Sequence, residues 1–351
     1  MKKLFSLLIV FSLISYGVLF ANPFSEENAV QPVQITTINN ISYESSLASF
    51  AQQPKDCLKI SFGSKDEEVG GVDQDPDHYT GGLPYSFLPQ SDGSVWILDS
   101  VNSCLKHFNS AGKFISKISL PTSTANKKVL YKDFSSAPDG GFYLYSGLDG
   151  SVLHIASDGK ILSVTKGLDG TLRLGTTPQG NLLVENPNQT GVIKLNPQGK
   201  VIGKFPNEYN LSTYCDSNGN PYGIKGDNDQ STVLYKVNSS APTKENILAS
   251  FTIDVFPGQT VHYVSRKVIG TDSQGNVYLE LVACDNSGNL YVNRDYKISP
   301  TGEVLSTLDF IYPPSVDSPD VPKHSMVTPD GKIMTITADT KSYGFVTYTF
   351  P

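Results

Sequence analysis

The chain has 351 residues, of which 38% are hydrophobic and 17% are charged, and its 27 Lys and Arg against 34 Asp and Glu give a formal net charge of −7. This composition excludes a disordered chain and the long helical pattern of a coiled coil. The sequence also lacks the clustered Lys and Arg that a nucleic-acid-binding surface needs. With 30 Gly and 22 Pro residues, it favours a single all-β domain rich in turns.

Residues 1–21 have the pattern of an export signal. Lys2 and Lys3 precede a largely apolar stretch, 4–20, and Ala21 suits the position before a cleavage site. A retained membrane anchor is the less favoured alternative, since about 17 to 20 apolar residues can span a bilayer. Residues 22–56 have the composition of a linker or a peripheral strand. We therefore expect an exported protein, periplasmic or extracellular, with no membrane span after signal cleavage.

A repeated glycine turn organises residues 57–351, which we expect to form one domain. In each repeat a Gly that follows polar residues has apolar alternation on either side, and such a Gly supplies the positive φ of a tight hairpin. The turn glycines are Gly93, Gly140, Gly180, Gly219, Gly275 and Gly331, and a second turn follows at Gly112, Gly159, Gly199 and Gly302. Two hairpins within about 40 to 50 residues predict one four-stranded propeller blade.

One repeat resembles a known family. The segment 83–114, LPYSFLPQSDGSVWILDSVNSCLKHFNSAGKF, resembles a blade of the NHL type in its Pro before the first strand, its DG turn, the second strand that ends in Asp99, and Asn102. The other repeats resemble it only in their turns. The chain from Leu58 to Phe350 is thus similar to six-bladed β-propellers of the NHL-repeat and TolB-like group, a resemblance that implies a fold but no single activity. Seven blades are less favoured, because six hairpin patterns are present.

The ring is expected to close with a strand from the N-terminal side. The last repeat supplies three strands, at 324–328, 332–338 and 343–350, and the strand 58–62 precedes the first complete repeat. That strand would be the fourth strand of the last blade. This arrangement removes two exposed sheet edges, which otherwise promote aggregation.

A site is expected where the first strand of each blade enters the central channel. Counting back seven residues from each turn glycine gives Ser86, Asp133, Arg173, Ser212, Val268 and His324. The residues two positions earlier share the same strand face and include Tyr131 and Arg266. Arg suits planar, bidentate contact with a carboxylate or phosphate. An anion-binding mouth would comprise Arg173, Arg266, Asp133, His324, Lys132, Lys267, Lys323 and Tyr131. A structural ion pair between Asp133 and Arg173 across the channel is the favoured interpretation of those two residues, and the ligand-binding mouth is the second.

Metal-binding patterns are weaker. Asp73, Asp75 and Asp77 alternate before the first blade, and their hard oxygens suit Ca²⁺ or another divalent metal. His78 stands where an EF-hand requires Gly, so that motif is rejected, and a solvated acidic loop is the alternative.

Two functions follow from these patterns. The favoured one is an exported, monomeric binding scaffold that recognises a protein, a glycan or a small anionic ligand through its channel-mouth loops. The second is a metal-dependent hydrolase or lyase, lactonase-like or NHL-type lyase-like, since the lyases that the resemblance implies hold a channel metal with His. His78, His262 and His324 are expected in or beside the loops that lead into first strands, whereas His107 and His154 fall on third strands. No nucleophile motif such as GxSxG is present.

The four cysteines are expected to be largely unpaired. Export favours disulfides, and the absence of a CxxC motif excludes a zinc ribbon. By height in the propeller Cys104 matches Cys284 and Cys57 matches Cys215, yet these pairs fall in blades that are not neighbours. A bridge needs Cα atoms within about 7 Å.

Overall fold

A computed structural model describes residues 35–38, 56–71, 84, 86–121, 131–186, 191–205, 210–228, 231–237, 245–253, 260–288, 290–309, 323–338 and 341–351. These residues all belong to one compact unit, Val33–Pro351. The predicted export signal, 1–21, lies outside them, as do Asp73, Asp75 and Asp77. Within the described residues every regular element is a strand, and no helix there has the length and apolar character to cross a membrane.

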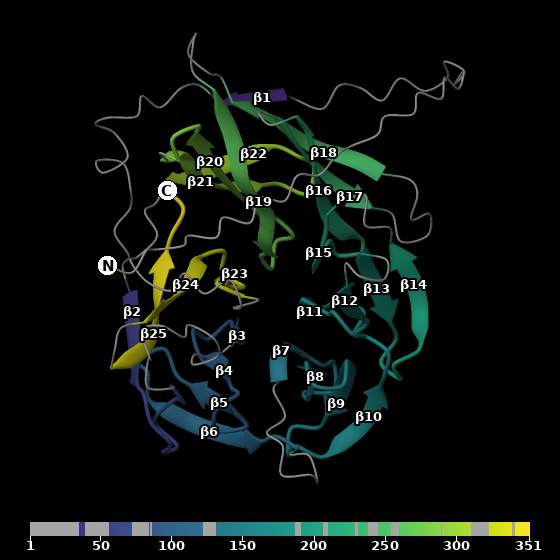
Figure 1. Cartoon of the computed structure of the whole chain (residues 1–351), viewed down its shortest axis with the longest axis vertical. Coiled ribbons are helices and arrows are strands. Elements are labelled where there is room, and N and C mark those ends of the chain that lie inside the picture. The colour runs from purple at the N-terminus through teal and green to yellow at the C-terminus, as the bar shows by residue number, and fades with distance from the viewer. Residues whose placement is uncertain are drawn as a thin grey trace, which may run out of the picture. The chain divides into compact units, whose positions relative to one another are not determined.

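The strands form six sheets arranged in a ring (Figure 1). Blade one contains β3 (Ser86–Pro89), β4 (Val95–Asp99), β5 (Cys104–Phe108) and β6 (Phe114–Ser119). Blade two contains β7 (Tyr131–Ser136), β8 (Phe142–Ser146), β9 (Ser151–Ile155) and β10 (Ile161–Thr165). Blade three contains β11 (Arg173–Thr176), β12 (Leu182–Asn186), β13 (Gly191–Leu195) and β14 (Val201–Phe205).

The remaining blades follow the same order with longer strands. Blade four contains β15 (Leu211–Cys215), β16 (Pro221–Asn228), β17 (Ser231–Val237) and β18 (Glu245–Ile253). Blade five contains β19 (Val261–Thr271), β20 (Val277–Asp285), β21 (Leu290–Ile298) and β22 (Val304–Asp309). Blade six contains β23 (Ser325–Val327), β24 (Ile333–Ala338), β25 (Ser342–Tyr348) and β2 (Asp56–Ser61). Each first strand contacts the first strand of the next blade, and β23 contacts β3.

The predicted closure of the ring is confirmed. β2 pairs antiparallel with β25 from Asp56 opposite Thr347 to Ser61 opposite Ser342, so a strand from the N-terminal side completes blade six. A further short strand, β1 (Ile35–Ile38), pairs in parallel with β18 at the outer edge of blade four. The all-β, six-bladed propeller predicted from the repeat is therefore the observed fold.

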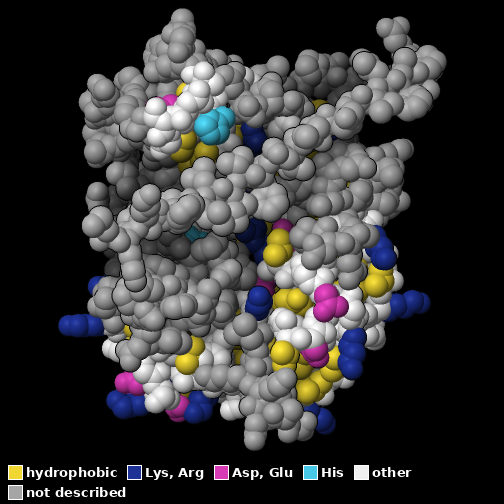
Figure 2. Space-filling view, in the orientation of Figure 1, with side chains coloured by type: hydrophobic (Ala, Val, Ile, Leu, Met, Phe, Trp, Pro, Cys, Tyr) yellow, Lys and Arg dark blue, Asp and Glu magenta, His cyan; other side chains and the backbone are white. Residues whose placement is uncertain are grey.

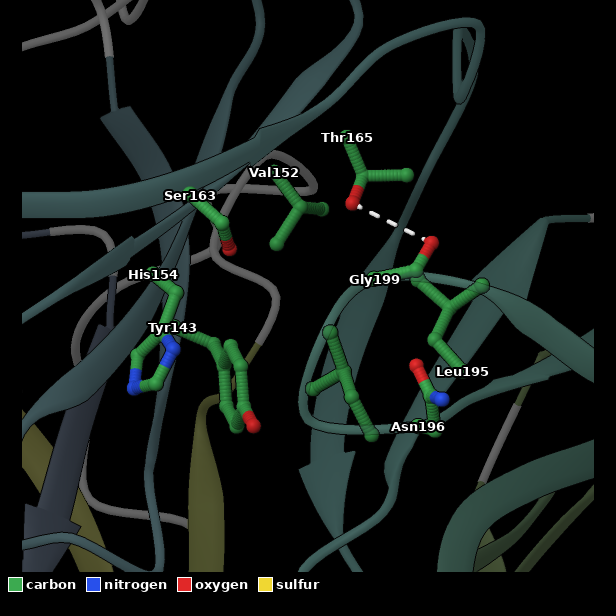
Figure 3. A pocket seen from close by; sticks show the side chains of 9 residues that line it. Tyr143, Val152, His154, Ser163, Thr165, Leu195, Asn196 and Gly199 are labelled. Carbon is green, nitrogen blue, oxygen red and sulfur yellow. Dashed lines mark hydrogen bonds between the residues drawn. The ribbon is translucent and has the colours of Figure 1, made fainter.

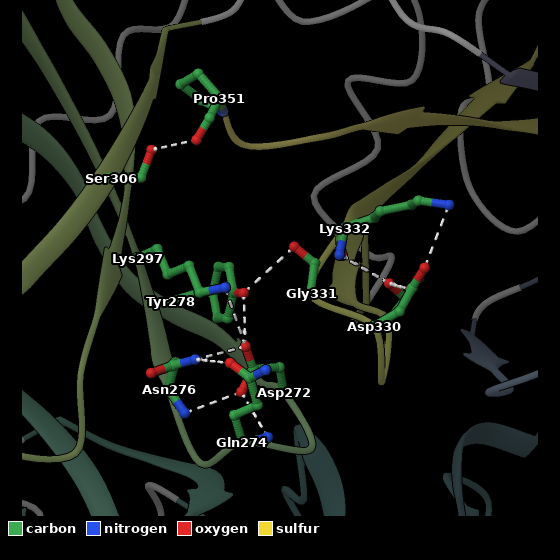
Figure 4. Close-up of polar contacts among 11 residues, drawn as sticks. Asp272, Gln274, Asn276, Tyr278, Lys297, Ser306, Asp330, Gly331, Lys332 and Pro351 are labelled. Atoms are coloured by element: carbon green, nitrogen blue, oxygen red, sulfur yellow. Dashed lines mark hydrogen bonds and ion pairs between the residues drawn. The ribbon is translucent and has the colours of Figure 1, made fainter.

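The glycine turns fix the register of the blades. All ten predicted turn glycines have φ between 76° and 94°, and each donates its backbone N–H to the carbonyl three residues earlier. The turn of Gly275 shows the role of the polar residues (Figure 4): Asp272 Oδ1 accepts from the backbone N–H groups of Gln274 and Asn276, at 3.0 and 2.9 Å. Its Oδ2 accepts from Asn276 Nδ2 at 2.8 Å and from Tyr278 Oη at 2.9 Å. The polar side chains of the repeated pattern thus accept hydrogen bonds from the backbone N–H groups of the turn itself.

The hydrophobic core is divided among the interfaces between blades. Phe87 of blade one packs with Phe345 of blade six, with ring centroids 4.7 Å apart. Between blades five and six, Ile269 and Leu308 pack with Val327. Because side chains alternate along each strand, one packs in the interface with the preceding blade and the next packs in the interface with the following blade. Ser86 on β3 and Asp133 on β7 are polar residues of two first strands, and their side chains contact each other.

Candidate functional site

Asp133 on β7 is the polar centre of the ring. Its carboxylate is fully buried, accepts from Ser86 Oγ on β3 at 2.5 Å and from the backbone N–H of Leu174 on β11 at 2.6 Å, and forms an ion pair with Lys323 Nζ at 2.9 Å. The ammonium of Lys323 also donates to the carbonyl of Phe134. Asp133 therefore connects blades one, two, three and six, with Lys323 as an ion-pair partner.

A small cavity of about 60 Å³ lies among the first strands of blades three to six. We call it the axial cavity. Figure 2 shows Lys and Arg side chains near the centre of this view of the molecule, with acidic side chains beside them. The residues that line the axial cavity are Arg173, Tyr214, Lys267, Val268, Ile269, His324 and Ser325.

Two basic residues of the axial cavity face carboxyl groups on the neighbouring second strands. Arg173 on β11 stands opposite Glu185 on β12, and Lys267 on β19 stands opposite Glu280 on β20. Lys267 Nζ lies 2.9 Å from Glu280 Oε1. Burial raises the pKa of Glu185, and the negative charge of Asp133 adds to this effect while Arg173 opposes it. The Glu185 carboxyl therefore takes up a proton more readily than an exposed glutamate does.

Tyr214 on β15 adds a hydroxyl group to the wall of the axial cavity. Burial raises its pKa to about 12, while the charge of Arg173 acts in the opposite direction. At neutral pH the side chain is therefore a neutral phenol, which can both donate and accept a hydrogen bond.

The structure brings together some of the predicted mouth residues and separates others. Arg173, Lys267 and His324 line the axial cavity, with Asp133 and Lys323 paired nearby. Tyr131 lies in the core and donates its hydroxyl to the carbonyl of Pro121 at 2.8 Å. Lys132 is exposed, and its side chain lies against Gly147. Arg266 lies over the ring of Tyr263 at 4.6 Å, with its guanidinium against Gly226 of blade four.

A register shift in β19 explains why counting selected Val268 in blade five. The shift between Val268 and Gly270 moves the residues just before it by one position, so Lys267 pairs with Glu280 as Arg173 pairs with Glu185. Val268 packs into the core between blades four and five. Glu185 and Glu280 were not predicted from the sequence, because they lie on second strands and the predicted mouth consisted of residues at first strands. Each follows its turn glycine by five residues, which is a pattern that the sequence does contain.

The metal and cysteine predictions concern residues that the structure describes in part. Within the residues that the structure describes, no group of three His, Cys, Asp or Glu is arranged to hold a metal ion. Asp73, Asp75 and Asp77, predicted as weak metal ligands, lie outside those residues. Cys104, Cys215 and Cys284 are free, in agreement with the prediction, and the side chain of Cys57 is not among those described.

A second cavity, between blades two and three, is far smaller. It has about 10 Å³ and is lined by polar and apolar groups that include Tyr143, His154 and Asn196 (Figure 3). Thr165 Oγ1 donates across it to the carbonyl of Gly199 at 3.4 Å. This volume matches a single water molecule, so this cavity is not a ligand site.

Comparison with known proteins supports the fold. No protein-family model matches the chain, and no curated protein sequence matches it. A Bacteroides fragilis protein described as exported is 12% identical with a TM-score of 0.53, over 90% of this chain and 99% of that one. Virginiamycin B lyase from Staphylococcus aureus is 14% identical with a TM-score of 0.46, over 82% and 87%. A luciferin-regenerating enzyme is 15% identical with a TM-score of 0.43, over 84% and 95%. At these identities the likeness concerns the propeller fold alone.

Proposed function

We propose that the protein is an exported propeller that binds a small carboxylate or similar anion in the axial cavity. The observation that carries this proposal is that Arg173, Lys267 and His324, from three different blades, line one cavity. Arg is suited to bidentate contact with a planar anion, and Lys and protonated His add charge-assisted hydrogen bonds. Tyr214 and Ser325 supply hydroxyl groups that fix the orientation of a ligand.

The size of the axial cavity favours a small anion, or the anionic group of a longer ligand, over a protein or glycan surface. Its volume of about 60 Å³ is well below the roughly 300 Å³ at which pockets for drug-sized ligands begin. A protein or glycan partner would have to use the loops between blades, most of which lie outside the described residues.

The proposal has two further parts: the protein is exported, and it is a member of the NHL-repeat and TolB-like group. Export is supported by the pattern of residues 1–21, with the fold likeness to a Bacteroides fragilis protein described as exported. Membership of the NHL-repeat and TolB-like group rests on the segment 83–114.

A melting-temperature panel tests anion binding. Acetate, pyruvate and sulfate are added at constant ionic strength to the wild type and to Arg173→Gln and Lys267→Gln. The control is Lys160→Gln, which removes an exposed lysine beside the turn of Gly159. A ligand that binds only the folded state raises the melting temperature. We expect at least one anion to stabilise the wild type and the control and to lose this effect in the two cavity variants.

The same panel also distinguishes anion binding from the alternative function, a metal-dependent hydrolase or lyase. If no anion stabilises the wild type, or if all four proteins respond equally, the proposal is wrong. Divalent cations with a chelator control are included, because a metal-dependent hydrolase or lyase would be stabilised by its metal.

A further inference from the structure

A pair of carboxyl groups lies between blades five and six. Glu280 on β20 and Asp295 on β21 are directly opposite each other in the antiparallel ladder. Side chains at such positions have Cβ atoms about 4.5 to 5.5 Å apart and project from the same face of the sheet. That face is the one that packs on blade six, because Tyr278, two residues before Glu280, belongs to the core shared with Val327 and Ile333.

Asp295 is the unusual member of the pair. Its side chain is fully buried, and within the described part of the chain neither of its carboxyl oxygens has a hydrogen-bond partner. An ionised carboxylate in this position would lose its hydration without compensation. Burial therefore raises the pKa of Asp295 well above its usual value, and the neighbouring charge of Glu280 raises it further.

Lys267 connects this pair to the axial cavity. Its side chain lines the cavity, while its ammonium lies 2.9 Å from Glu280 Oε1. The same Glu280 oxygen accepts from Ser265 Oγ at 3.4 Å. An anion that reaches Lys267 therefore approaches the carboxyl pair as well.

Among the residues that the structure describes, few other charged groups lie near Asp295. Glu280 and Asp309 raise its pKa and Lys267 lowers it. Asp309, on β22, forms a bidentate pair with Arg294 at 2.5 and 2.8 Å. On the facing strands of blade six, alternation places the hydroxyl groups of Ser325 and Thr335 toward blade five, 3.1 Å from each other.

We propose that anion binding in the axial cavity is coupled to the uptake of a proton by the Glu280–Asp295 pair. This inference rests on the proposed function. An anion beside Lys267 adds a negative charge next to the pair and weakens the compensation that Lys267 gives to Glu280. A nearby like charge disfavours the ionised form of a carboxyl group, so the pair takes up a proton when the anion binds.

The sign of the pH effect follows by linkage. Because the complex holds more protons than the free protein, the affinity for the anion falls as the pH rises through the range in which the pair titrates. With one proton coupled, the fall approaches about tenfold per pH unit. The protein would then bind its ligand in mildly acidic surroundings and release it in alkaline ones.

Calorimetric titration in buffers of different ionisation enthalpy measures the protons taken up. The probe is acetate, pyruvate or sulfate, whichever gives the largest melting shift, and the range is from about pH 6 to about pH 9, above the titration of unperturbed Asp and Glu. His324 also lines the cavity, and histidine changes charge near neutral pH. The measurement is therefore made in the wild type, in Asp295→Asn and, separately, in Glu280→Gln, so that any proton taken up by His324 is common to the three proteins and cancels in the differences between them.

We expect the wild type to take up close to one proton more than Asp295→Asn does at some pH in this range. Asp295→Asn should abolish that uptake and flatten the affinity profile, while Glu280→Gln should shift the uptake to lower pH. Proton uptake that is absent throughout, or that persists unchanged in Asp295→Asn, overturns the coupling and leaves anion binding standing. If the wild type binds none of the three anions, the proposed function itself fails.

Discussion

Lys323 Nζ lies 2.9 Å from Asp133 Oδ1, and both side chains are buried. Lys323 lies two residues before β23, the first strand of blade six, and Asp133 lies in the first strand of blade two, so the ion pair connects two blades that are not neighbours. Hydrogen bonds to Asp133 from Ser86 and Leu174 add blades one and three. The carboxylate of Asp133 thus links the first strands of blades one, two and three to Lys323, and the axial cavity lies beside this carboxylate.

Removing the cation of this pair should destabilise the fold strongly. Lys323→Met leaves Asp133 buried without its counter-charge, and the expected loss is about 3 to 5 kcal/mol in the free energy of unfolding, measured with urea. Lys117→Met is the matched control, because Lys117 pairs with Asp66 at the surface, where such pairs contribute about 0 to 1 kcal/mol. Equal losses in the two variants would show that the buried pair does not hold the ring.

The buried carboxyl of Asp295 should make stability depend on pH. Its pKa is raised in the folded state, so the folded protein holds a proton that the unfolded chain has released, and stability falls as the pH rises between the unfolded and folded pKa values. Asp295→Asn removes this dependence. In urea unfolding, we expect the free energy of unfolding of Asp295→Asn to rise relative to that of the wild type as the pH rises, by at most about 1.4 kcal/mol per pH unit. Parallel pH profiles would contradict the raised pKa.

The close packing of the closing strand β2 on β25 should depend on Gly344. A Cβ at Gly344 would lie 2.0 Å from the carbonyl oxygen of Leu58 on β2, whereas a Cβ at Gly203 on β14 would meet its nearest atom at 3.6 Å. Gly344→Ala must push β2 away from β25, and we expect a loss of about 1 to 3 kcal/mol. Gly203→Ala should leave the free energy of unfolding almost unchanged. Thermal unfolding of the two variants measures the difference. Similar melting temperatures for the two variants would mean that β2 does not close the ring tightly.

The described cysteines should differ in reactivity. Burial raises the pKa of Cys104 to about 11 and that of Cys215 to about 12, whereas Cys284 is more exposed and its pKa is raised less. Because the thiolate is the reactive form, alkylation at mildly alkaline pH should modify Cys284 first and the other two only after unfolding. Peptide mass spectrometry reads out each site. Early modification of Cys215 would contradict its burial.

The fold was predictable because its determinants are local. Each blade carries a polar-polar-Gly turn whose conformation follows from the residues themselves, as Asp272 and Gly275 show. The strand 58–62 could be assigned to closure because the last repeat lacks one strand. The pairing of β1 with β18 has no such local pattern, since it joins residues far apart in the chain.

The site was predictable only where strand register was regular. Counting from the turn glycine placed Arg173 and His324 at the axial cavity, where the structure also finds them. In blade five the register shift near Gly270 moved Lys267 into the position that counting gave to Val268. Asp295 lies on a third strand, and only the assembled interface shows that it is buried beside Glu280.

Anomalous diffraction from crystals grown with a brominated carboxylate tests the central claim most directly. If the axial cavity binds anions, the carboxylate should lie within hydrogen-bond distance of Arg173 and Lys267, with the bromine signal beside it. In crystals of Lys267→Gln that signal should weaken or disappear. A bromine signal confined to exposed lysines, with none at the axial cavity, would contradict anion binding at the ring axis.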